Sequence, residues 1–88
     1  MAWTVSFDPR ALKELEKLDR MAQKSIVNFL QERVLRRTDP REVGKAMVGD
    51  KAGLWRYRVD DYRLICHIDD AAELMRVLRV AHRKEAHR

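Results

Sequence analysis

One segment, residues 54–68, limits the possible folds more than any other part of the chain. Apolar and charged residues alternate along it on both sides of the pair Asp60-Asp61. Alternation with a period of two is typical of β-strands with one buried face, and a polar pair between two such runs predicts a tight hairpin turn. In that register Arg58 lies opposite Arg63. The segment is therefore predicted to form two antiparallel strands.

The residues before this hairpin predict one more strand and two helices. Residues 2–7 alternate with their apolar side chains on one side, as in a half-buried strand. Asp8-Pro9 and then Asp19 are helix-start signals, because an aspartate side chain can accept a hydrogen bond from a free backbone N–H. Aliphatic residues follow each signal at spacings of three and four. We expect two short amphipathic helices that form a hairpin lying on the sheet.

From Arg36 to Gly53 the periodicity fades, and all three glycines of the chain fall in this stretch. We expect a loop there, with one helical turn around Glu42–Met47, and the glycine spacing does not match a nucleotide-binding P-loop. The strands predicted for the second half are Leu54–Val59, Tyr62–Ile68 and Leu74 to about Ala81. The sequence thus predicts one α+β domain over residues 1–88, with an N-terminal strand, a helical hairpin and an antiparallel three-stranded meander.

The composition favours a polyanionic partner. The 88 residues include 19 Lys+Arg against 14 Asp+Glu, with a net charge of +5 and a pI near 9.8. This basicity suits nucleic acid or an acidic protein and does not choose between them. The single cysteine, Cys66, excludes an internal disulfide framework, and the dispersed histidines lack metal-ligand spacing, so we expect no metal and no other cofactor. No apolar run reaches about 20 residues and no secretory signal opens the chain, which predicts a cytoplasmic protein without membrane contact.

The hairpin collects arginine residues on one face. Because side chains alternate along a strand, its apolar residues share the face that receives the helices. These residues are Trp55, Tyr57, Val59, Tyr62, Leu64 and Cys66. The opposite face carries Arg56, Arg58, Arg63 and His67. Arg83, just past the last strand, adds a fourth guanidinium group if that strand lies alongside. The term arginine cluster denotes Arg56, Arg58, Arg63 and Arg83 below.

Stability alone does not explain the arginine cluster, because like charges directly opposite each other on a sheet are destabilising. Either acidic side chains neutralise the cluster, with Asp60, Asp61 and Glu85 as candidates, or an external anion does. Arginine presents a planar fork of donors that fits a phosphate group. The pattern is therefore compatible with a phosphate-binding site and also with an ordinary charged surface.

Three segments, together with a first strand that closes in Phe7-Asp8, have a characteristic sequence. They are Ala-Leu-Lys-Glu-Leu-x-Lys-Leu (residues 11–18), Leu-Trp-Arg-Tyr-Arg-Val-Asp-Asp-Tyr-Arg-Leu-Ile-Cys-His-Ile (54–68) and Val-Leu-Arg-Val-Ala-His-Arg-Lys-Glu-Ala-His-Arg (77–88). The chain resembles the RelE/ParE toxins of bacterial type II toxin–antitoxin systems in these segments, over essentially its whole length. The hairpin and the His-Arg ending are more similar to the RelE branch. The resemblance implies a compact, microbial-ribonuclease-like fold.

The resemblance also implies an activity and partners. RelE toxins enter the ribosomal A site and cut the mRNA there without a metal or other cofactor. The ribose 2′-hydroxyl attacks the adjacent phosphate and leaves a 2′,3′-cyclic phosphate and a 5′-hydroxyl. A cognate, RelB-like antitoxin wraps and neutralises such a toxin, and operator DNA is expected to bind only through the toxin–antitoxin complex. By this resemblance the chain is a ribosome-dependent endoribonuclease that inhibits translation.

The functional positions of the family correspond to the arginine cluster and to the last residues of the chain. Arg56 and Arg58 match basic hairpin positions of the family, and Arg63 matches the arginine of the Tyr-Arg-Leu motif. Arg83 matches the arginine that stabilises the transition state or protonates the leaving oxygen. His87 stands where the family often has a tyrosine that stacks on the substrate base. The implied catalytic residues are Arg56, Arg58, Arg63, Arg83 and His87. The implied RNA-binding residues are Arg56, Arg58, Arg63, His82, Arg83 and Lys84.

Two of these positions depart from the family pattern. Some RelE enzymes have lysine at the hairpin positions, where one is a candidate general base. Arg56 and Arg58 keep the charge but hardly deprotonate, because the pKa of arginine is above about 12. Cleavage would then depend on electrostatic stabilisation of the phosphorane, or on another base. Our hypothesis is that His87 takes part of the acid/base role, in which case a His87→Phe variant does not cut.

Two alternatives remain open at this point. ParE toxins share the fold but poison DNA gyrase by binding it, without ribonuclease chemistry, and the missing lysines and terminal tyrosine favour this function. A toxin homologue that has lost catalysis and persists as an antitoxin-binding module is the other alternative. Translation arrest in a cell-free system distinguishes the RelE activity from the ParE activity.

Overall fold

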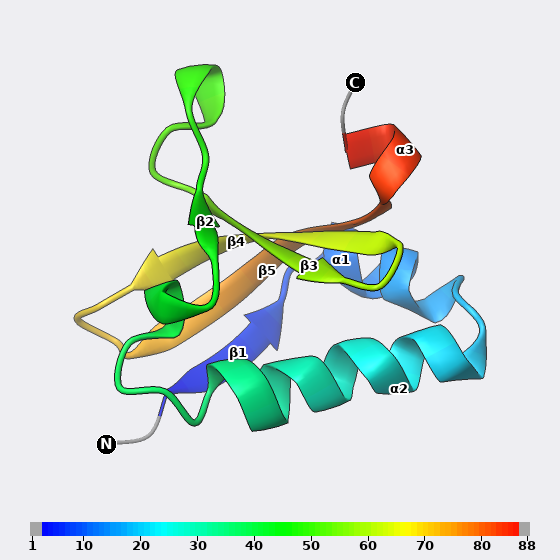
Figure 1. The fold of residues 1–88 in the computed structure, drawn as a ribbon, viewed down its shortest axis with the longest axis horizontal. Helices are drawn as coiled ribbons and strands as arrows, with labels where there is room; N and C mark the ends of the chain where they lie inside the picture. Colours follow the sequence, from blue (N-terminus) through cyan, green and yellow to red (C-terminus); the bar gives the residue numbers. More distant parts are fainter. Residues whose placement is uncertain (1–2, 87–88) are drawn as a thin grey trace.

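The computed structural model describes residues 3–86, and in this part of the chain five strands form one sheet in the order β1-β5-β4-β3-β2. Helices α1 and α2 pack on one face of the sheet (Figure 1). The strands are β1 (Thr4–Phe7), β2 (Lys45–Ala46), β3 (Trp55–Val59), β4 (Tyr62–Asp69) and β5 (Leu74–His82). The helices are α1 (Pro9–Glu16), α2 (Arg20–Phe29) and α3 (Arg83–Ala86). None of the helices in residues 3–86 has the length and apolar character needed to cross a bilayer.

The predicted α+β fold is confirmed, including the antiparallel meander β3-β4-β5. β1 lies parallel to β5 at one edge of the sheet. The hairpin has the predicted register, with Arg58 opposite Arg63 across the Asp60-Asp61 turn. Asp60 has a φ of 53°, a left-handed conformation that aspartate tolerates better than most other non-glycine residues. The turn thereby determines which side chains of β3 and β4 share a face.

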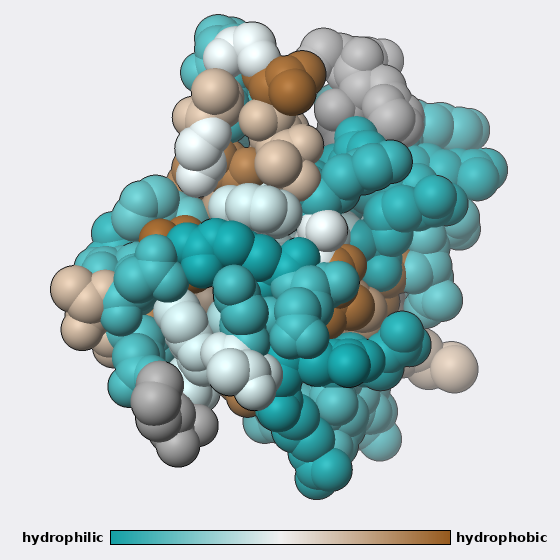
Figure 2. Space-filling model, turned by 60° about the vertical axis from the view of Figure 1, so that its left-hand side comes forward, coloured by the Kyte–Doolittle hydropathy of each residue, from teal (hydrophilic) through white to brown (hydrophobic). Residues whose placement is uncertain are grey.

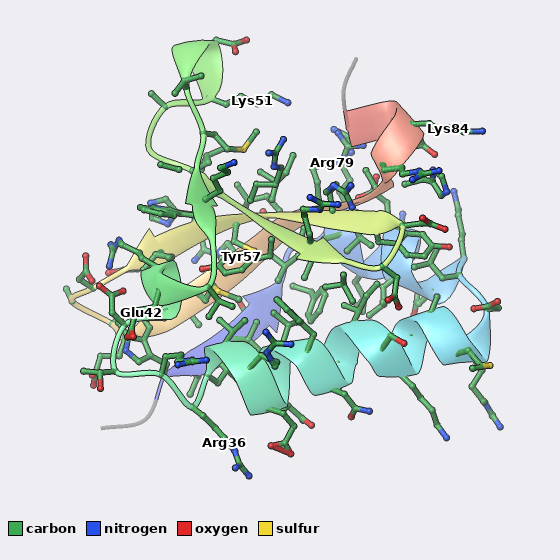
Figure 3. All side chains as sticks on the ribbon, viewed as in Figure 1. Arg36, Glu42, Lys51, Tyr57, Arg79 and Lys84 are labelled. Carbon is green, nitrogen blue, oxygen red and sulfur yellow. The ribbon has the colours of Figure 1, made fainter. Side chains whose placement is uncertain are left out.

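Apolar side chains from the two helices and the sheet form the core. Its buried members include Ala11, Leu15, Ile26, Leu30, Tyr57, Val59, Leu64, Cys66, Met75 and Val77. The predicted inward face of the hairpin is part of this core. Tyr57 (Figure 3) is fully buried, and its ring lies edge-on to the Phe29 ring with 6.3 Å between the centroids. The Tyr57 hydroxyl donates a hydrogen bond to the Pro40 carbonyl at 2.9 Å. Burial raises the pKa of the Cys66 thiol to about 12, so this side chain packs as a small, protonated apolar group.

The helices differ from the prediction in two details. In α1 the aliphatic spacing predicts Leu12, Leu15 and Leu18 on the buried side; Leu15 is buried and Leu18 packs on the core, but Leu12 is 44% exposed and Ala11 is fully buried instead. Asp19 caps α2 as expected and accepts a hydrogen bond from a backbone N–H at 2.8 Å. The expected cap by Asp8 is wrong: its side chain makes no cap hydrogen bond and instead lies 3.6 Å from Nε of Arg76.

The stretch between α2 and β3 also differs from the prediction. The expected helical turn over Glu42–Met47 is wrong, because a 3-10 turn occurs earlier, at Pro40–Glu42, and the chain then forms β2 beside β3. Gly44 lies between this turn and β2. A Cβ at that position would come within 2.8 Å of the Tyr57 ring, so the close approach of the chain to the core requires glycine.

Two segments project from the face of the sheet opposite α2 (Figure 1). One is the stretch that follows β2, which includes a 3-10 turn at Gly49–Lys51 and the 84% exposed side chain of Val48. Figure 2 shows apolar side chains on this segment, above a largely hydrophilic surface. The other is α3, which the sequence patterns did not predict. The two segments flank the open face of the sheet.

β5 contains a bulge near its middle. Ile65 pairs with Arg79, whereas the next residue, Cys66, pairs with Val77, so Leu78 is an extra residue on β5. An extra residue reverses the side-chain alternation beyond it. The bulge therefore decides which side chains in the last part of β5 face the core.

Beyond the bulge, α1 covers the edge of β5 in place of a strand. β1 ends at Phe7, opposite Val77. Glu14 of α1 accepts a hydrogen bond from the Val80 N–H at 2.9 Å, and its carboxylate lies 3.0 Å from Nη2 of Arg79. Burial raises the pKa of Glu14, but the hydrogen bonds from Arg79 and Val80 outweigh it, so the pKa is below its ordinary value. Glu14 thus attaches α1 to the part of β5 that leads into α3.

A Tyr57→Phe variant is expected to lose about 1–2 kcal/mol of unfolding free energy, because the buried Pro40 carbonyl then lacks its donor. Urea denaturation followed by circular dichroism measures this loss. Tyr62→Phe, at a partly exposed position, is the matched control and should lose less than about 0.5 kcal/mol. Equal losses in the two variants would contradict this role of the Tyr57 hydroxyl.

A Glu14→Gln variant is expected to flatten the acid dependence of stability. A carboxyl whose pKa is lower in the folded state stabilises the fold above its unfolded pKa, and this contribution is lost as the pH falls through the folded pKa. Below about pH 4.3 the wild type should therefore lose more stability than Glu14→Gln. Urea midpoints at neutral and acidic pH test this, with the exposed Glu16→Gln as a control that should behave like the wild type. Parallel curves for wild type and Glu14→Gln would show that Glu14 does not carry the effect.

Candidate nucleic-acid interface

The β3–β4 hairpin places three members of the arginine cluster on one face of the sheet. Arg58 lies directly opposite Arg63, and Arg56, two residues earlier on β3, shares their face. Within residues 3–86, no carboxylate lies within 4.0 Å of the Arg56 or Arg58 guanidinium group. Because like charges opposite each other destabilise a sheet, this face is electrostatically unfavourable without a ligand.

β2 adds a cation that the sequence patterns did not place. Lys45 pairs with Arg56 across β2 and β3 and forms a second pair of like charges. Lys45 falls in the helical turn expected over Glu42–Met47. A strand of two residues is too short to show any alternation, so no periodic signal could have revealed it.

Arg63 has the most unusual surroundings of the cluster. It is only 5% exposed. Its Nη1 donates to the carbonyl oxygens of Asp60, at 3.2 Å, and Tyr62, at 2.9 Å, and no carboxylate of residues 3–86 lies within 4.0 Å of it. Burial, and then the charges of the other three cluster arginines, lower the pKa of Arg63. Arginine nevertheless stays charged at neutral pH, so the fold holds a cation in a largely desolvated position.

Arg83 begins α3 and joins the cluster from the end of β5. Its backbone N–H donates to the Asp61 carbonyl at 2.7 Å, and its Nε lies 3.7 Å from Oδ1 of the same residue. Both side chains are more than half exposed, and ion pairs in such positions are weak. The acidic residues that could have neutralised the cluster therefore do so only in part, and the face keeps its positive charge.

The other predicted site residues lie away from the cluster. His82 pairs with Tyr62 and so lies on the face of the sheet opposite Arg63, with 5.7 Å between the His82 and Tyr62 ring centroids. Its Nδ1 accepts a hydrogen bond from the Lys84 N–H at 3.3 Å. Lys84 is exposed on α3, and its side chain points away from the sheet (Figure 3). His87 lies outside the described residues.

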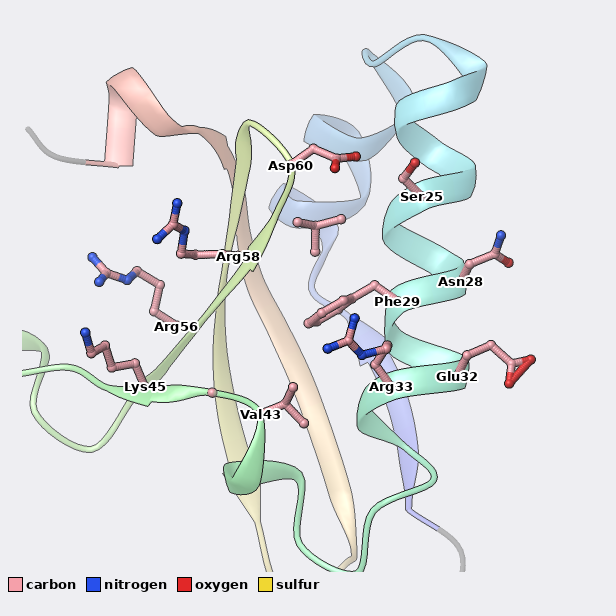
Figure 4. Close-up of a pocket in the computed structure, with 12 residues that line it drawn as sticks. Ser25, Asn28, Phe29, Glu32, Arg33, Val43, Lys45, Arg56, Arg58 and Asp60 are labelled. Carbon is pink, nitrogen blue, oxygen red and sulfur yellow. The ribbon is translucent and has the colours of Figure 1, made fainter.

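A groove with a volume of about 800 Å³ adjoins the cluster at the edge of β3 (Figure 4). β2 begins only at Lys45, opposite Arg56, so no strand of the described chain covers the edge of β3 near Arg58. Arg56 and Arg58 line the groove from β3, and Phe29 and Arg33 line it from the helical side. The sequence patterns gave no sign of this groove, because it forms between segments far apart in the chain.

The arrangement can bind a phosphate group and stabilise negative charge that develops on it. Guanidinium donors match phosphate oxygens, and a desolvated cation attracts an anion more strongly than a cation in water does. The described residues contain no group of three or more His, Cys, Asp or Glu side chains placed to hold a metal ion.

Sequence comparison relates the chain to toxins of toxin–antitoxin systems. Residues 5–87 match the family described as "ParE toxin of type II toxin-antitoxin system, parDE". The chain is also 34% identical over 88 residues to Toxin RelG of Mycobacterium tuberculosis, an alignment that covers 100% of this chain and 99% of that protein.

Solved structures agree with the sequence comparison. The toxin–antitoxin complex RelBE2 of Mycobacterium tuberculosis contains a chain 33% identical to this one, with a TM-score of 0.85 over 93% of this chain and 99% of that one. The intact RelBE complex of E. coli contains a chain 25% identical, with a TM-score of 0.62 over 92% of this chain and 96% of that one. The chain belongs to the RelE/ParE family of toxins of type II toxin–antitoxin systems.

Proposed function

We propose that this toxin is a ribosome-dependent endoribonuclease that cuts mRNA in the A site and so inhibits translation in the cytoplasm. The observation that carries the proposal is Arg63, a residue only 5% exposed that lies beside three further arginines and has no carboxylate of residues 3–86 within 4.0 Å of its guanidinium. Such a charge is costly unless a ligand of opposite sign binds it. The 34% sequence identity to Toxin RelG over the whole chain supports a phosphodiester as that ligand.

In the proposed reaction the ribose 2′-oxygen attacks the adjacent phosphorus and its proton passes to water, while the bond from phosphorus to the 5′-oxygen breaks. The products are a 2′,3′-cyclic phosphate and a 5′-hydroxyl. Arg56, Arg58 and Arg63 hold the phosphate and stabilise the extra negative charge of the phosphorane. In this proposal Arg83 stabilises the charge that develops on the leaving 5′-oxygen, and His87 donates the proton that this oxygen takes up. The ribosome supplies much of the positioning of the mRNA, so free RNA should be cut weakly or not at all.

We also infer a RelB-like antitoxin as the partner that neutralises the toxin. The RelBE2 and E. coli RelBE structures are toxin–antitoxin complexes, which supports this partner for the present chain. A net charge of +5 is complementary to an acidic antitoxin segment and to ribosomal RNA. Operator DNA would then bind through the antitoxin in the complex.

Inhibition of DNA gyrase without RNA cleavage is the second candidate function. It is favoured by the match of residues 5–87 to the family described as ParE toxin, and by the absence of lysine from positions 56 and 58. Binding to gyrase would require no catalytic phosphate site. The arginine cluster therefore supports the nuclease over the gyrase function, because only the nuclease uses it for chemistry.

The proposed activity predicts a specific result in toeprinting on programmed ribosomes. The wild type should produce a cut in the A-site codon, and an Arg63→Ala/Arg83→Ala variant should reduce the rate of cutting by at least about 100-fold, because the phosphorane loses two cations. An Arg36→Ala/Arg37→Ala variant is the matched control, since it removes two exposed arginines at the end of the helical segment and should cut like the wild type.

The other outcomes separate the alternatives. Growth arrest on induced expression without any A-site cut would contradict the nuclease and favour the gyrase function. The wild type could instead bind the antitoxin tightly, cut no mRNA and leave growth unchanged on expression. This result would show that catalysis has been lost. Equal cutting by the wild type and the Arg63→Ala/Arg83→Ala variant would contradict the role of the arginine cluster.

A further inference from the structure

The groove beside the arginine cluster contains a cation that the proposed reaction does not use. Arg33 extends into the groove from the end of the helical segment, whereas its neighbour Glu32 points away from it (Figure 4). Glu32 instead pairs with Arg36, at 2.9 Å between Oε2 and Nε. Within residues 3–86, no carboxylate lies within 4.0 Å of the Arg33 guanidinium. The helical wall of the groove thus presents an unneutralised positive charge.

Arg33 lies within a π turn. The segment Leu30–Val34 directly after α2 is a π turn, in which the Leu35 N–H donates to the Leu30 carbonyl at 2.8 Å. Arg33 follows Phe29 by four residues, and side chains at this spacing are neighbours on a helical surface. Arg33 accordingly lies over Phe29, with its guanidinium carbon 5.8 Å from the ring centroid, in cation–π geometry. π turns are frequent at functional sites, and this one holds a cation on the groove wall.

The groove and the arginine cluster form one continuous basic surface. Arg56 and Arg58 belong to the cluster and also line the groove. The edge of β3 near Arg58, on the side toward Arg33, has no covering strand in the described chain, because β2 begins only at Lys45, opposite Arg56. A polyanionic strand with one phosphate at the cluster can therefore pass over this edge and place another phosphate beside Arg33.

We propose that the groove is a second phosphate subsite, in which Arg33 binds the backbone of the same RNA strand whose reacting phosphate lies at the arginine cluster. This inference rests on the proposed nuclease function and extends it from one phosphate to the path of the strand. RNA is the favoured occupant because the groove is continuous with the cluster and its wall offers a planar guanidinium donor that has no carboxylate of residues 3–86 within 4.0 Å. Asp60 also lines the groove, at its hairpin end. Arg33 acts here as a positioning residue, remote from the reacting phosphate.

Anisotropy titration with a fluorescent, fully 2′-O-methylated single-stranded RNA tests the subsite, because this RNA can bind but cannot be cleaved. Arg33→Ala should weaken binding about fivefold at low salt, and the slope of log K against log salt should decrease by about 0.7, the value for one phosphate contact with a single strand. Arg33→Lys keeps the charge and should retain most of the slope. Arg36→Ala is the matched control, since it removes the same charge from a 74% exposed side chain that pairs with Glu32.

Two results would overturn the subsite. One is an affinity and salt slope of Arg33→Ala equal to those of Arg36→Ala. The other is a loss of antitoxin affinity in Arg33→Ala with unchanged RNA binding, which would assign the groove to an acidic protein segment. Either result leaves A-site cutting by the wild type intact. Failure of the wild type to cut in the toeprinting assay, in contrast, would overturn the nuclease function itself, so the two failures are distinguishable.

Discussion

The repulsion between the arginines around Arg63 is the interaction on which the rest of this structure depends. Arg63 is 5% exposed, lies opposite Arg58, and has carbonyl oxygens rather than a carboxylate as its acceptors in residues 3–86. Covering a charged side chain without an ion-pair partner is unfavourable, and the neighbouring arginines add repulsion. An anion that binds only the folded state offsets this cost. In the proposed function, the arginine cluster thus lowers the stability of the free toxin and raises its affinity for the substrate phosphate.

The apolar core makes this arrangement possible. Tyr57 and Leu64 face the helices, so a register slip of one residue would expose them and turn the arginines into the core. Packing against α1 and α2 therefore determines the hairpin register and, through it, the like-charge pairs of the opposite face. Glu14 helps to position Arg83 just past the end of β5. It accepts a hydrogen bond from the Val80 N–H, on the part of the β5 edge that β1 does not cover, and so fixes the end of β5 from which Arg83 follows.

The sequence predicted the features that depend on local periodicity. The hairpin, its register and its two faces follow from alternation around one polar pair, and the structure confirms them. β2 (Lys45–Ala46) and α3 escaped prediction because two and four residues are too few to show a period. The bulge at Leu78 was not predicted, because it appears only in the pairing of β4 with β5. The burial of Arg63 and the groove position of Arg33 depend on segments distant in the chain, which no local pattern records.

Urea unfolding of the wild type and an Arg63→Met variant, each titrated with inorganic pyrophosphate, tests the central claim most directly. Without the anion, Arg63→Met should be at least as stable as the wild type, because an apolar side chain of similar length replaces a buried charge. Pyrophosphate should then stabilise the wild type more than the variant, since only the wild type retains the complete arginine cluster. A variant that is less stable by more than about 2 kcal/mol and responds to pyrophosphate like the wild type would contradict the account.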